Sequence, residues 1–431
     1  MDTNRKTAYR ILHSMEREGS YSNLAINRTI GANKPDDPAF VRQLVYGVTE
    51  NQILLDYLLD QLMDKGVQSL RGPAKILLRM GVYQAGFLDS VPDYAAVSET
   101  VNLCRRVAKG REGLVNGVLR NYIRRKEQLT LPDEKLDETQ YLSVKYSCDP
   151  SLVALWLQQR GREETEQLLA FAATVPPVYV RANFQKTGIT DLAEAFDQAG
   201  YETAVSAISP RVLAVRGRDI LSLPAYQKGW FSVQNQCSTA IADWVQPEPG
   251  QRVIDLCSAP GGKAMAMAEA MHNQGSILAC DLYPHRLELI EKEQTRLGLS
   301  IVEPCQHDSR QWMAEWAETA DRVLADVPCS GTGVIREKPD LKYKPILDGG
   351  AGLAQVQGRI LQSGFGYLKP GGRLVYSTCT LNQTENQQVT GAFLAEAPDA
   401  TCLFEKEFLP VDGCDGFYVC VIEKRKETPR R

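Results

Sequence analysis

The first 130 residues carry their apolar side chains at helical spacing. In the segment 53–63, ILLDYLLDQLM, leucine recurs every three or four positions, which is the period of an amphipathic helix. A second helix is predicted to begin at Pro92, because proline suits the first turn of a helix. The segment 114–126 predicts a third helix. Because this region shows no alternating strand pattern, we expect an all-α bundle over residues 1–130.

The pattern changes after this bundle. Residues 131–147 are polar and acidic with little periodicity, which is typical of a linker. The β-branched and aromatic residues of 177–184 and 211–217 predict two strands, with a helix over 189–200 between them. We therefore expect a small α/β module over residues 148–230.

Short apolar runs alternate with helical segments over residues 231–431. The runs RVIDLCS, SILACDL, DRVLADVP and GGRLVYSTC each have the length of a strand. Strands that are buried on both faces of a parallel sheet give continuous apolar runs of this kind. We therefore expect a doubly wound, parallel α/β sheet, which is the Rossmann-like fold class.

Composition narrows the class of protein without identifying it. The 431 residues are 43% hydrophobic and 24% charged, so the chain has ample apolar material for large cores and is not predominantly disordered. No apolar run approaches the ~18 residues of a membrane span. The eleven cysteines include no paired C-x-x-C units of a structural zinc site. We expect free thiols, no metal, a cytoplasmic location and no membrane partner.

Charge is distributed unevenly along the chain. Residues 1–130 hold 19 basic and 14 acidic residues, whereas the remaining 301 hold 30 and 39. Within 71–126 there are 11 basic residues against 4 acidic ones. Such asymmetry indicates either a polyanionic partner or an ordinary solvated helix surface. The arginines at or beside the outward positions of the predicted helices are Arg105, Arg106, Arg120, Arg124 and Arg125. Arg336 and Lys338 are further candidates for local contacts of the same kind, or are ordinary surface charges.

A turn follows the first strand of the C-terminal region, in the segment VIDLCSAPGGKA (253–264). The strand ends at Asp255, and the turn holds Pro260-Gly261-Gly262 before a helix begins. Ligands of open α/β sheets bind at the carboxyl ends of the strands, and glycine lets a ligand approach the backbone closely. The segment lacks G-x-G-x-x-G, so it is not a dinucleotide fingerprint. It is either a site for a nucleotide-like group or a structural turn.

Acidic residues follow the next two predicted strands. Asp281 comes 19 positions after Gly262, close to the spacing at which an acidic residue hydrogen-bonds ribose hydroxyls. Asp308 is expected at the same edge of the sheet and is a candidate partner for an adenine amino group. Both aspartates are also candidates for helix caps, a common role at such positions.

Two cysteines follow the remaining predicted strands. Cys329 lies in LADVPCSGTGVIREKPDLK, three residues after Asp326, and Cys379 lies in LVYSTCTLNQTEN. A single cysteine is more often a small buried hydrophobe. Two cysteines at the carboxyl ends of two core strands, each beside small polar residues, instead indicate reactive thiols in a polar, partly exposed site.

These segments resemble the signatures of the Sun/Fmu family of RNA cytosine-5 methyltransferases. The family carries D-x-C-A-A-P-G-G-K-T, D-A-P-C-S-G-T-G, and T-C-S/T followed by E-N; this chain has DLCSAPGGKA, DVPCSGTG and STCTLNQTEN. The segment 231–250 is similar to the family's lead-in to the first strand, and the helical N-terminal region is similar to NusB-type RNA-binding domains. Ser258, Ala264 and Val327 depart from the signatures by modest side-chain changes.

The resemblance covers essentially the whole chain and implies a fold, a cofactor and a substrate. It implies an all-α NusB-like bundle (1–130), a linker (131–147), a small α/β module (148–230) and a Rossmann-like class I methyltransferase domain (231–431). The implied cofactor is S-adenosylmethionine (SAM), and no metal is implied. The implied substrate is a cytosine of 16S ribosomal RNA, methylated at C5. We expect it in a structured loop, because an already unpaired base costs least to extrude. The implied enzyme is a cytoplasmic monomer.

The resemblance also implies roles for individual residues. Cys379 corresponds to the nucleophile that adds to cytosine C6, and Cys329 to the second cysteine that helps release the product. We infer that Asp326 hydrogen-bonds either the cytosine edge or the cofactor. Lys263 either lowers the pKa of a nearby thiol or orients Asp326. The implied SAM contacts are Cys257, Ser258, Ala259, Pro260, Gly261, Gly262, Lys263, Asp281, Asp308 and Asp326.

Other functions fit parts of the sequence. A Rossmann oxidoreductase would need the G-x-G-x-x-G turn and would leave the two cysteines unexplained. An amino-group methyltransferase acting on adenine uses an Asn/Asp-Pro-Pro-aromatic loop, where this chain reads D-V-P-C. A DNA cytosine methyltransferase uses a Pro-Cys nucleophile, which would be Cys329 here. The last alternative is a non-enzymatic RNA-binding assembly factor.

Overall fold

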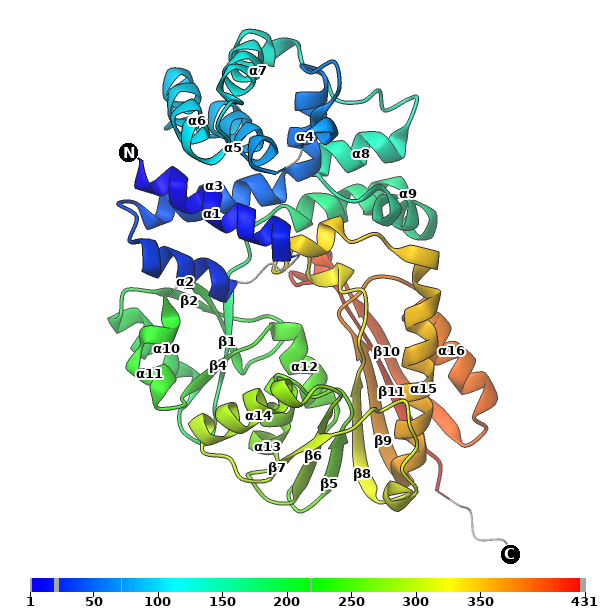
Figure 1. The fold of residues 1–431 in the computed structure, drawn as a ribbon. Helices are drawn as coiled ribbons and strands as arrows, with labels where there is room; N and C mark the ends of the chain where they lie inside the picture. Colours follow the sequence, from blue (N-terminus) through cyan, green and yellow to red (C-terminus); the bar gives the residue numbers. More distant parts are fainter. Residues whose placement is uncertain (1, 19–22, 71, 218, 427–431) are drawn as a thin grey trace, which may run out of the picture. The chain divides into compact units, whose positions relative to one another are not determined.

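The computed structural model describes residues 2–18, 23–70, 72–217 and 219–426, and the chain divides into two compact units. The helical unit comprises Met1–Thr174 together with Lys338–Pro345. The sheet unit comprises Val175–Glu337 together with Ile346–Arg431. Each unit is continuous in space although its residues come from two parts of the sequence (Figure 1).

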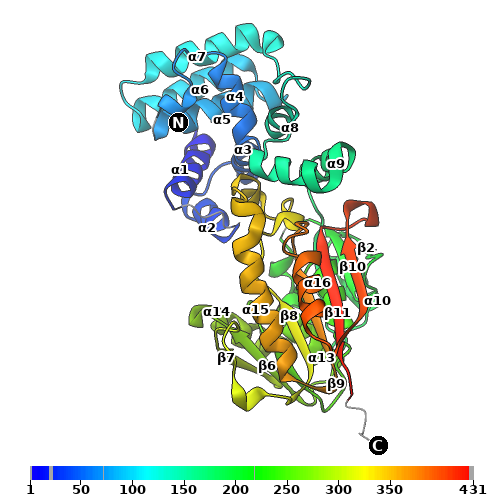
Figure 2. The ribbon, with the colours of Figure 1, turned by 90° about the vertical axis from the view of Figure 1, so that its right-hand side faces the viewer.

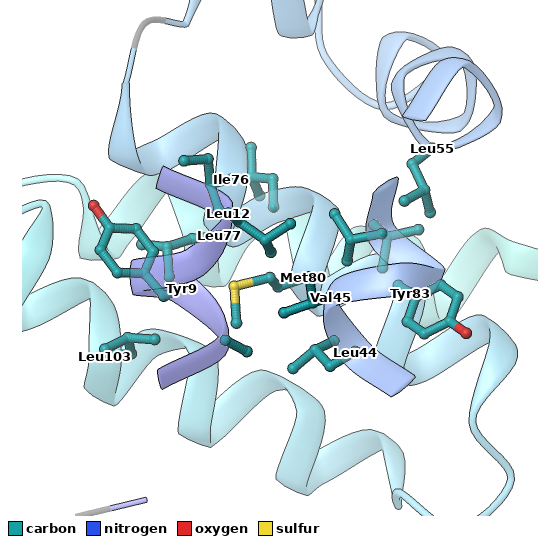
Figure 3. Close-up of a cluster of buried hydrophobic side chains, with 14 of the residues drawn as sticks. Tyr9, Leu12, Leu44, Val45, Leu55, Ile76, Leu77, Met80, Tyr83 and Leu103 are labelled. Carbon is teal, nitrogen blue, oxygen red and sulfur yellow. The ribbon is translucent and has the colours of Figure 1, made fainter. Parts of the chain in front are cut away.

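The described part of the helical unit is built from helices and their connections. The helix α5 (Pro73–Phe87) packs against its neighbours on several sides, because its side chains are apolar almost all round. Figure 3 shows Leu77 and Met80 of α5 surrounded by Leu12, Leu44 and Leu103 of three other helices. The predicted all-α N-terminal bundle is therefore confirmed. The other α-helices are α1 (Thr3–Glu18), α2 (Asn23–Asn33), α3 (Pro38–Glu50), α4 (Gln52–Asp60), α6 (Asp93–Val107), α7 (Glu112–Arg125), α8 (Glu138–Tyr146) and α9 (Pro150–Ala172).

Helix α8 lies in the segment where the sequence predicts a linker. The carboxylate of Asp137 accepts a hydrogen bond from the backbone N of Gln140 (2.8 Å) and so caps the first turn. Leu142 and Val144 are buried. A helix this short offers few apolar positions, so its periodicity is weak. Helix α9 follows it in the same compact unit, whose first segment ends at Thr174.

A small antiparallel sheet opens the sheet unit. Its strand order is β2-β3-β1-β4, and the helix α10 (Ile189–Gln198) packs on it through Phe196, which contacts the ring of Phe231. The two strands predicted over 177–184 and 211–217 are confirmed as β1 and β3. The strands are β1 (Val178–Ala182), β2 (Glu202–Val205), β3 (Val212–Arg216) and β4 (Phe231–Val233), with the short helix α11 (Pro224–Gln227) before β4.

The large sheet has the strand order β10-β11-β9-β8-β5-β6-β7. Helices α12, α13 and α14 cover one face, and α15 and α16 cover the other (Figures 1 and 2). This is the expected Rossmann-like architecture. Its strands are β5 (Arg252–Asp255), β6 (Ser276–Asp281), β7 (Val302–Gln306), β8 (Ala320–Asp326), β9 (Leu368–Thr378), β10 (Ala400–Phe408) and β11 (Phe417–Lys424). Its helices are α12 (Gln236–Trp244), α13 (Gly262–Ala270), α14 (Pro284–Leu297), α15 (Ala351–Tyr367) and α16 (Gln387–Glu396).

The sheet is mixed: the four strands predicted from the sequence, β5, β6, β8 and β9, are parallel, and an antiparallel strand is added beside β9. Strands β5 to β9 are parallel to one another, but β11 is antiparallel to both β9 and β10. The reason lies in the connection between β10 and β11, which is too short for the crossover that parallel strands require. Among the described helices, none combines the length and the apolar character needed to cross a bilayer.

Candidate active site

Four strand ends bring the predicted site residues to one edge of the large sheet. Strand β5 ends at Asp255, β6 at Asp281 and β8 at Asp326, and β9 ends at Thr378, directly before Cys379. These strands are parallel neighbours in the order β9-β8-β5-β6, so their carboxyl ends share an edge. The chain winds outward from β5 to β7 and then returns to β8, so β5 and β8 flank a topological switch point, where ligands of such sheets bind.

The glycine turn between β5 and α13 passes close to α14. Gly261 has φ +101°, and a Cβ at this position would lie 3.2 Å from Cγ1 of Ile290. Only glycine adopts this conformation without strain. Helix α13 begins at Gly262, and the amide groups in the first turn of a helix have no intrahelical acceptors. The turn therefore presents backbone donors at the sheet edge, where a polar ligand is favoured.

Two buried polar side chains lie beside this turn without a hydrogen bond of regular geometry to any described residue. They are the carboxylate of Asp255 and the hydroxyl of Ser258. Burial raises the pKa of Asp255 to about 7, and the nearby charge of Asp326 contributes to the rise. Leaving a buried polar group unpaired costs about 1–3 kcal/mol. The two groups fit the expected cofactor, because SAM carries an amine, a carboxylate and ribose hydroxyls that can act as partners.

Asp281 is almost fully buried and is tied to the glycine turn by Arg286. Nη1 of Arg286 lies 3.0 Å from Oδ2 of Asp281, and its Nη2 donates to the carbonyl oxygen of Ala259 at 2.6 Å. The backbone N of Tyr283 donates to Oδ1 of Asp281 at 3.1 Å. Arg286 was not among the residues predicted from the sequence. The available signal was its position five residues after the acidic strand end.

Asp308 lies on the loop after β7 and pairs with Arg310. The guanidinium donates to the carboxylate at 2.8 and 2.6 Å, and this pairing lowers the pKa of Asp308. The hydroxyl of the next residue, Ser309, donates to the carbonyl oxygen of Leu256 at 2.5 Å. The loop is thereby held against the start of the glycine turn, so Asp308 lies at the predicted edge of the sheet.

Lys263 and Asp326 form an ion pair between α13 and β8. Nζ of Lys263 lies 2.7 Å from Oδ2 of Asp326, and the hydroxyl of Ser377 donates to Oδ1 at 2.7 Å. Burial acts to lower the pKa of Lys263, but the charge of Asp326 outweighs it, and negative charge on Cys379 acts in the same direction, so the pKa is raised. Lys263 is therefore a fixed ammonium that interacts electrostatically with Cys379.

The two predicted thiols lie next to each other. Sγ of Cys329 is 3.4 Å from Sγ of Cys379, and both residues are partly exposed. Their loops are joined by a hydrogen bond from the backbone N of Gly333 to the carbonyl oxygen of Cys379 (3.0 Å). The hydroxyls of Ser330 and Thr380 also lie 2.7 Å apart. Residues 50 positions apart in the chain thus form one compact site.

A buried carboxylate holds the Cys329 loop. Glu385 is fully buried and accepts from the backbone N (2.9 Å) and the hydroxyl (2.5 Å) of Ser330, from Gln357 (3.0 Å) and from Asn382 (3.1 Å). Hydrogen bonding to Cys379, burial and the charge of Glu385 raise the pKa of Cys329 well above its usual range. The sequence analysis gave Glu385 no role, although its E-N pair belongs to the signature.

A buried arginine from the small antiparallel sheet forms hydrogen bonds with α13, the helix that follows the glycine turn. Arg181 is 0% exposed, and it donates to the carbonyl oxygen of Gly262 at 2.7 Å and to Oε1 of Glu269 at 2.7 Å. Arg211 donates to the other oxygen of Glu269 at 2.8 Å. Nothing in the sequence indicated this role, because Arg181 sits within an otherwise apolar strand. The small sheet therefore positions the first turn of α13.

Arg336 is not available for RNA contacts, contrary to one expectation from the sequence. Its side chain is 7% exposed and forms an ion pair with the fully buried Asp415. The amide of Asn235 also donates to Asp415 at 2.7 Å. Lys338, the other candidate, is exposed.

Two family models match the chain. Residues 242–415 match the family model of 16S rRNA methyltransferase RsmB/F, and residues 2–124 match the NusB family. Two curated relatives are each named "Probable ribosomal RNA small subunit methyltransferase B". The protein of Bacillus subtilis (strain 168) is 34% identical over 443 residues, which cover 98% of both chains. The protein of Synechocystis sp. is 36% identical over 405 residues, covering 92% of this chain and 90% of the relative.

Solved structures share the fold. The structure of PH0851 aligns with a TM-score of 0.85 at 23% identity, covering 98% of this chain and 99% of the other. A methyltransferase homologue from Pyrococcus horikoshii aligns with a TM-score of 0.59 at 25% identity, covering 67% of this chain and 99% of the other. The chain therefore belongs to the family of SAM-dependent 16S rRNA methyltransferases of the RsmB/F type, with a NusB-type domain at its N-terminus.

Proposed function

We propose that this protein methylates C5 of a cytosine in 16S ribosomal RNA through a covalent bond between Cys379 and C6 of the base. One observation carries the proposal: the thiols of Cys329 and Cys379 lie 3.4 Å apart at the sheet edge that also holds the glycine turn. Methylation of an exocyclic amine or a ribose hydroxyl needs no thiol. A pair of adjacent thiols is expected where one adds to a ring carbon and the other assists its departure.

We assign SAM to the turn formed by residues 257–263. We propose that Asp281 binds the ribose hydroxyls and Asp308 the adenine amino group, since Asp281 ends β6 and Asp308 follows β7. The buried side chains of Asp255 and Ser258 interact with each other without a hydrogen bond of regular geometry, which supports a polar ligand at this turn. When bound, SAM supplies an electrophilic methyl group. The protein contributes the position and the polarity of the site.

The electrostatic surroundings favour Cys379 as the nucleophile. The ammonium of Lys263 interacts with Cys379 and stabilises negative charge there. The contact with Cys379, burial and the charge of Glu385 instead raise the pKa of Cys329, which favours its neutral thiol form. The thiolate is the nucleophilic form of cysteine. The reverse assignment, with Cys329 as the nucleophile of a DNA-type mechanism, would place the thiolate beside a carboxylate.

The chemistry then follows from the electron demand of cytosine. The Cys379 thiolate adds to C6, and the electron pair of the C5–C6 double bond moves toward C5 and N3. C5 becomes enamine-like and would attack the methyl group that SAM supplies, so that the S–C bond breaks and its electron pair stays on the cofactor sulfur. A base removes the proton from C5, the C5–C6 double bond re-forms, and the thiolate leaves. We propose that Cys329 assists this last step from its place beside Cys379.

Asp326 has a second role in this scheme, in addition to its ion pair with Lys263. Its carboxylate keeps part of its surface exposed, with a side-chain exposure of 27%. Lys263 and Ser377 fix its orientation from two sides. We propose that Asp326 hydrogen-bonds the cytosine edge and favours a proton at N3 while charge accumulates in the ring. A contact with SAM is the alternative use of the same carboxylate.

The RNA must present an unpaired base. Extruding a paired base costs a few kcal/mol, and an already unstacked base costs least, so a loop of the ribosomal RNA is the favoured substrate. The exposed arginines of α6 and α7 supply phosphate contacts that position the RNA without reading its sequence.

Transfer of a radiolabelled methyl group to 16S RNA tests the proposal directly. The purified protein is incubated with labelled SAM and either naked 16S RNA or small-subunit particles, and the RNA is digested to nucleosides. We expect the label in 5-methylcytosine. Label in any other nucleoside would refute the C5 assignment. Absence of label from both substrates would refute the proposed methyltransferase activity. A Cys402→Ala variant, which alters an exposed cysteine on β10, should transfer the label as the wild-type protein does.

A further inference from the structure

A groove of about 780 Å³ lies between α6 and α7 in the helical unit. Its apolar lining comes from Val97 and Val101 of α6 and from Ile123 of α7. The side chains of Asn102 and Asn116 add hydrogen-bonding groups. A concave, largely apolar surface with a few polar groups is the usual form of a small-ligand or nucleobase site. Nothing in the methylation chemistry described above uses this groove.

An exposed aromatic ring stands in the lining of the groove. Tyr94, in the first turn of α6, is 77% exposed, and it is among the most exposed large apolar side chains of the described chain. A rigid ring left in water at the mouth of an apolar groove is a ready surface for stacking. Stacking of a base on an aromatic side chain contributes about 1–3 kcal/mol, and any of the four bases can use it.

Basic residues give the groove the charge of a nucleic-acid site. Arg105 and Arg120 line it from the two helices, and Asn102 accepts a hydrogen bond from Arg105 at 2.9 Å. Over residues 93–125 the chain has seven basic and three acidic residues. Of the acidic ones in the lining, Asp93 is paired with Lys126 (3.2 Å). Backbone hydrogen bonds lower the pKa of the other, Glu112, so it stays ionised at the start of α7.

We propose that this groove binds an unpaired nucleotide of the RNA substrate. The base stacks on Tyr94 above the apolar lining, and the neighbouring phosphates lie between Arg105 and Arg120. The inference rests on the proposed function, because it takes RNA as the substrate. It adds to that function a recognition point that favours single-stranded over duplex RNA, since only an unstacked base can enter. An acidic peptide is the competing occupant and is tested below.

Binding of short RNA to the full-length protein tests this site without any methylation. The probes are a fluorescent single-stranded RNA of about ten nucleotides and its duplex, titrated by anisotropy in the absence of SAM. We expect tighter binding of the single strand. Tyr94→Ala should weaken it about tenfold, the effect of losing ~1.4 kcal/mol, and Tyr94→Phe should not. The double variant Arg105→Gln/Arg120→Gln should reduce the slope of log affinity against log salt concentration by the equivalent of about one to two phosphate contacts.

Arg216→Gln is the matched control, because this arginine is also exposed but lies on β3 of the sheet unit. Tyr94 is mostly in solvent, so its truncation leaves the fold intact, and circular dichroism checks this. Equal affinity of Tyr94→Ala and wild type, or equal affinity for single strand and duplex, would overturn the proposal. Displacement of RNA by poly-glutamate at equal charge would assign the groove to an acidic peptide.

The outcome separates this site from the proposed function. If the wild-type protein transfers no methyl group to 16S RNA but Tyr94→Ala loses single-strand affinity, the groove stands and the enzyme assignment falls. If methyl transfer proceeds and Tyr94→Ala binds RNA and methylates it like wild type, the groove alone is refuted.

Discussion

Sγ of Cys329 lies 3.4 Å from Sγ of Cys379, although each sulfur comes from a different strand end. A fully buried carboxylate, Glu385, holds the loop of the first thiol, and the ammonium of Lys263 interacts with the second. Two chemically identical groups are therefore placed in opposite electrostatic surroundings. This asymmetry is the physical basis for giving the two thiols different roles.

Removing each thiol in turn should give different results. Cys379→Ala should lower methyl transfer by roughly 10³-fold or more, because the step that activates C5 is lost, while SAM binding measured by calorimetry stays near wild type. Cys329→Ala should still form the bond to C6 but release it slowly. A covalent protein–RNA adduct should then accumulate and appear as a retarded band in a denaturing gel.

Two results would contradict these roles. An adduct with Cys379→Ala and none with Cys329→Ala would exchange the two cysteines. Full turnover by Cys379→Ala would remove this thiol from the mechanism. Cys402→Ala, which changes an exposed cysteine outside the site, should behave as wild type in both assays.

Loss of the Lys263 charge should slow the reaction most at low pH. Lys263→Met removes an ammonium that stabilises the thiolate form of Cys379, so a higher pH is needed to generate the nucleophile. A charge-assisted interaction is worth about 1.5–3 kcal/mol, which corresponds to a rate loss of about 10–100-fold near neutral pH. The rate–pH profile should move to higher pH for Lys263→Met and much less for Lys263→Arg. Coincident profiles for the two variants would show that the charge has no part in activation.

Glu385 should control the protonation of Cys329 as well as the position of its loop. Glu385→Gln removes the charge and keeps the shape, so Cys329 should lose one of the causes of its raised pKa. In a Cys379→Ser background, alkylation of Cys329 by iodoacetamide, followed by mass spectrometry of its peptide, should become faster at a given pH. Ser330→Ala, which removes one hydrogen bond to Glu385 and no charge, is the control. Equal alkylation profiles would limit Glu385 to a structural role.

The sequence predicts the strand-end residues well because their signals are local. Asp255, Asp281, Asp326 and Cys379 each follow an apolar run, and the rule that parallel strands share an edge brings them together without further information. The directions of the last two strands, β10 and β11, could not be predicted in this way. A hairpin that returns antiparallel to the sheet has the same apolar pattern as a parallel strand, so the mixed sheet followed only from the structure.

Residues that act through burial are beyond such local signals. Glu385 and Arg181 are both 0% exposed, yet their types are usually found at the surface. Their partners, Ser330 and Glu269, lie 55 and 88 positions away in the chain. The prediction for Arg336 was wrong for the same reason. Its type and its place in the sequence suggested a surface charge, but it is paired with a buried aspartate. In each case a contact over a long sequence distance decides the role.

The buried carboxyl of Asp255 makes stability depend on pH. Its pKa is about 7 in the folded protein, mainly because the group is buried, whereas the pKa of an exposed aspartate is near 3.9. Between these values the folded state holds a proton that the unfolded state has released. The contribution of this group to stability is complete below the unfolded pKa and is lost progressively as pH rises to the folded pKa. The loss is about 1.4 kcal/mol for each pH unit within that window.

Asp255→Asn keeps the shape of the side chain and cannot ionise, so it should escape this loss. In urea denaturation between about pH 5.5 and pH 8, the stability of the variant relative to wild type should increase up to about pH 7 and then level off. Asp308→Asn is the control, because pairing with Arg310 lowers the pKa of Asp308. Its difference from wild type should stay constant over the same range. A constant difference for Asp255→Asn as well would mean that this carboxyl is ionised in the folded protein throughout.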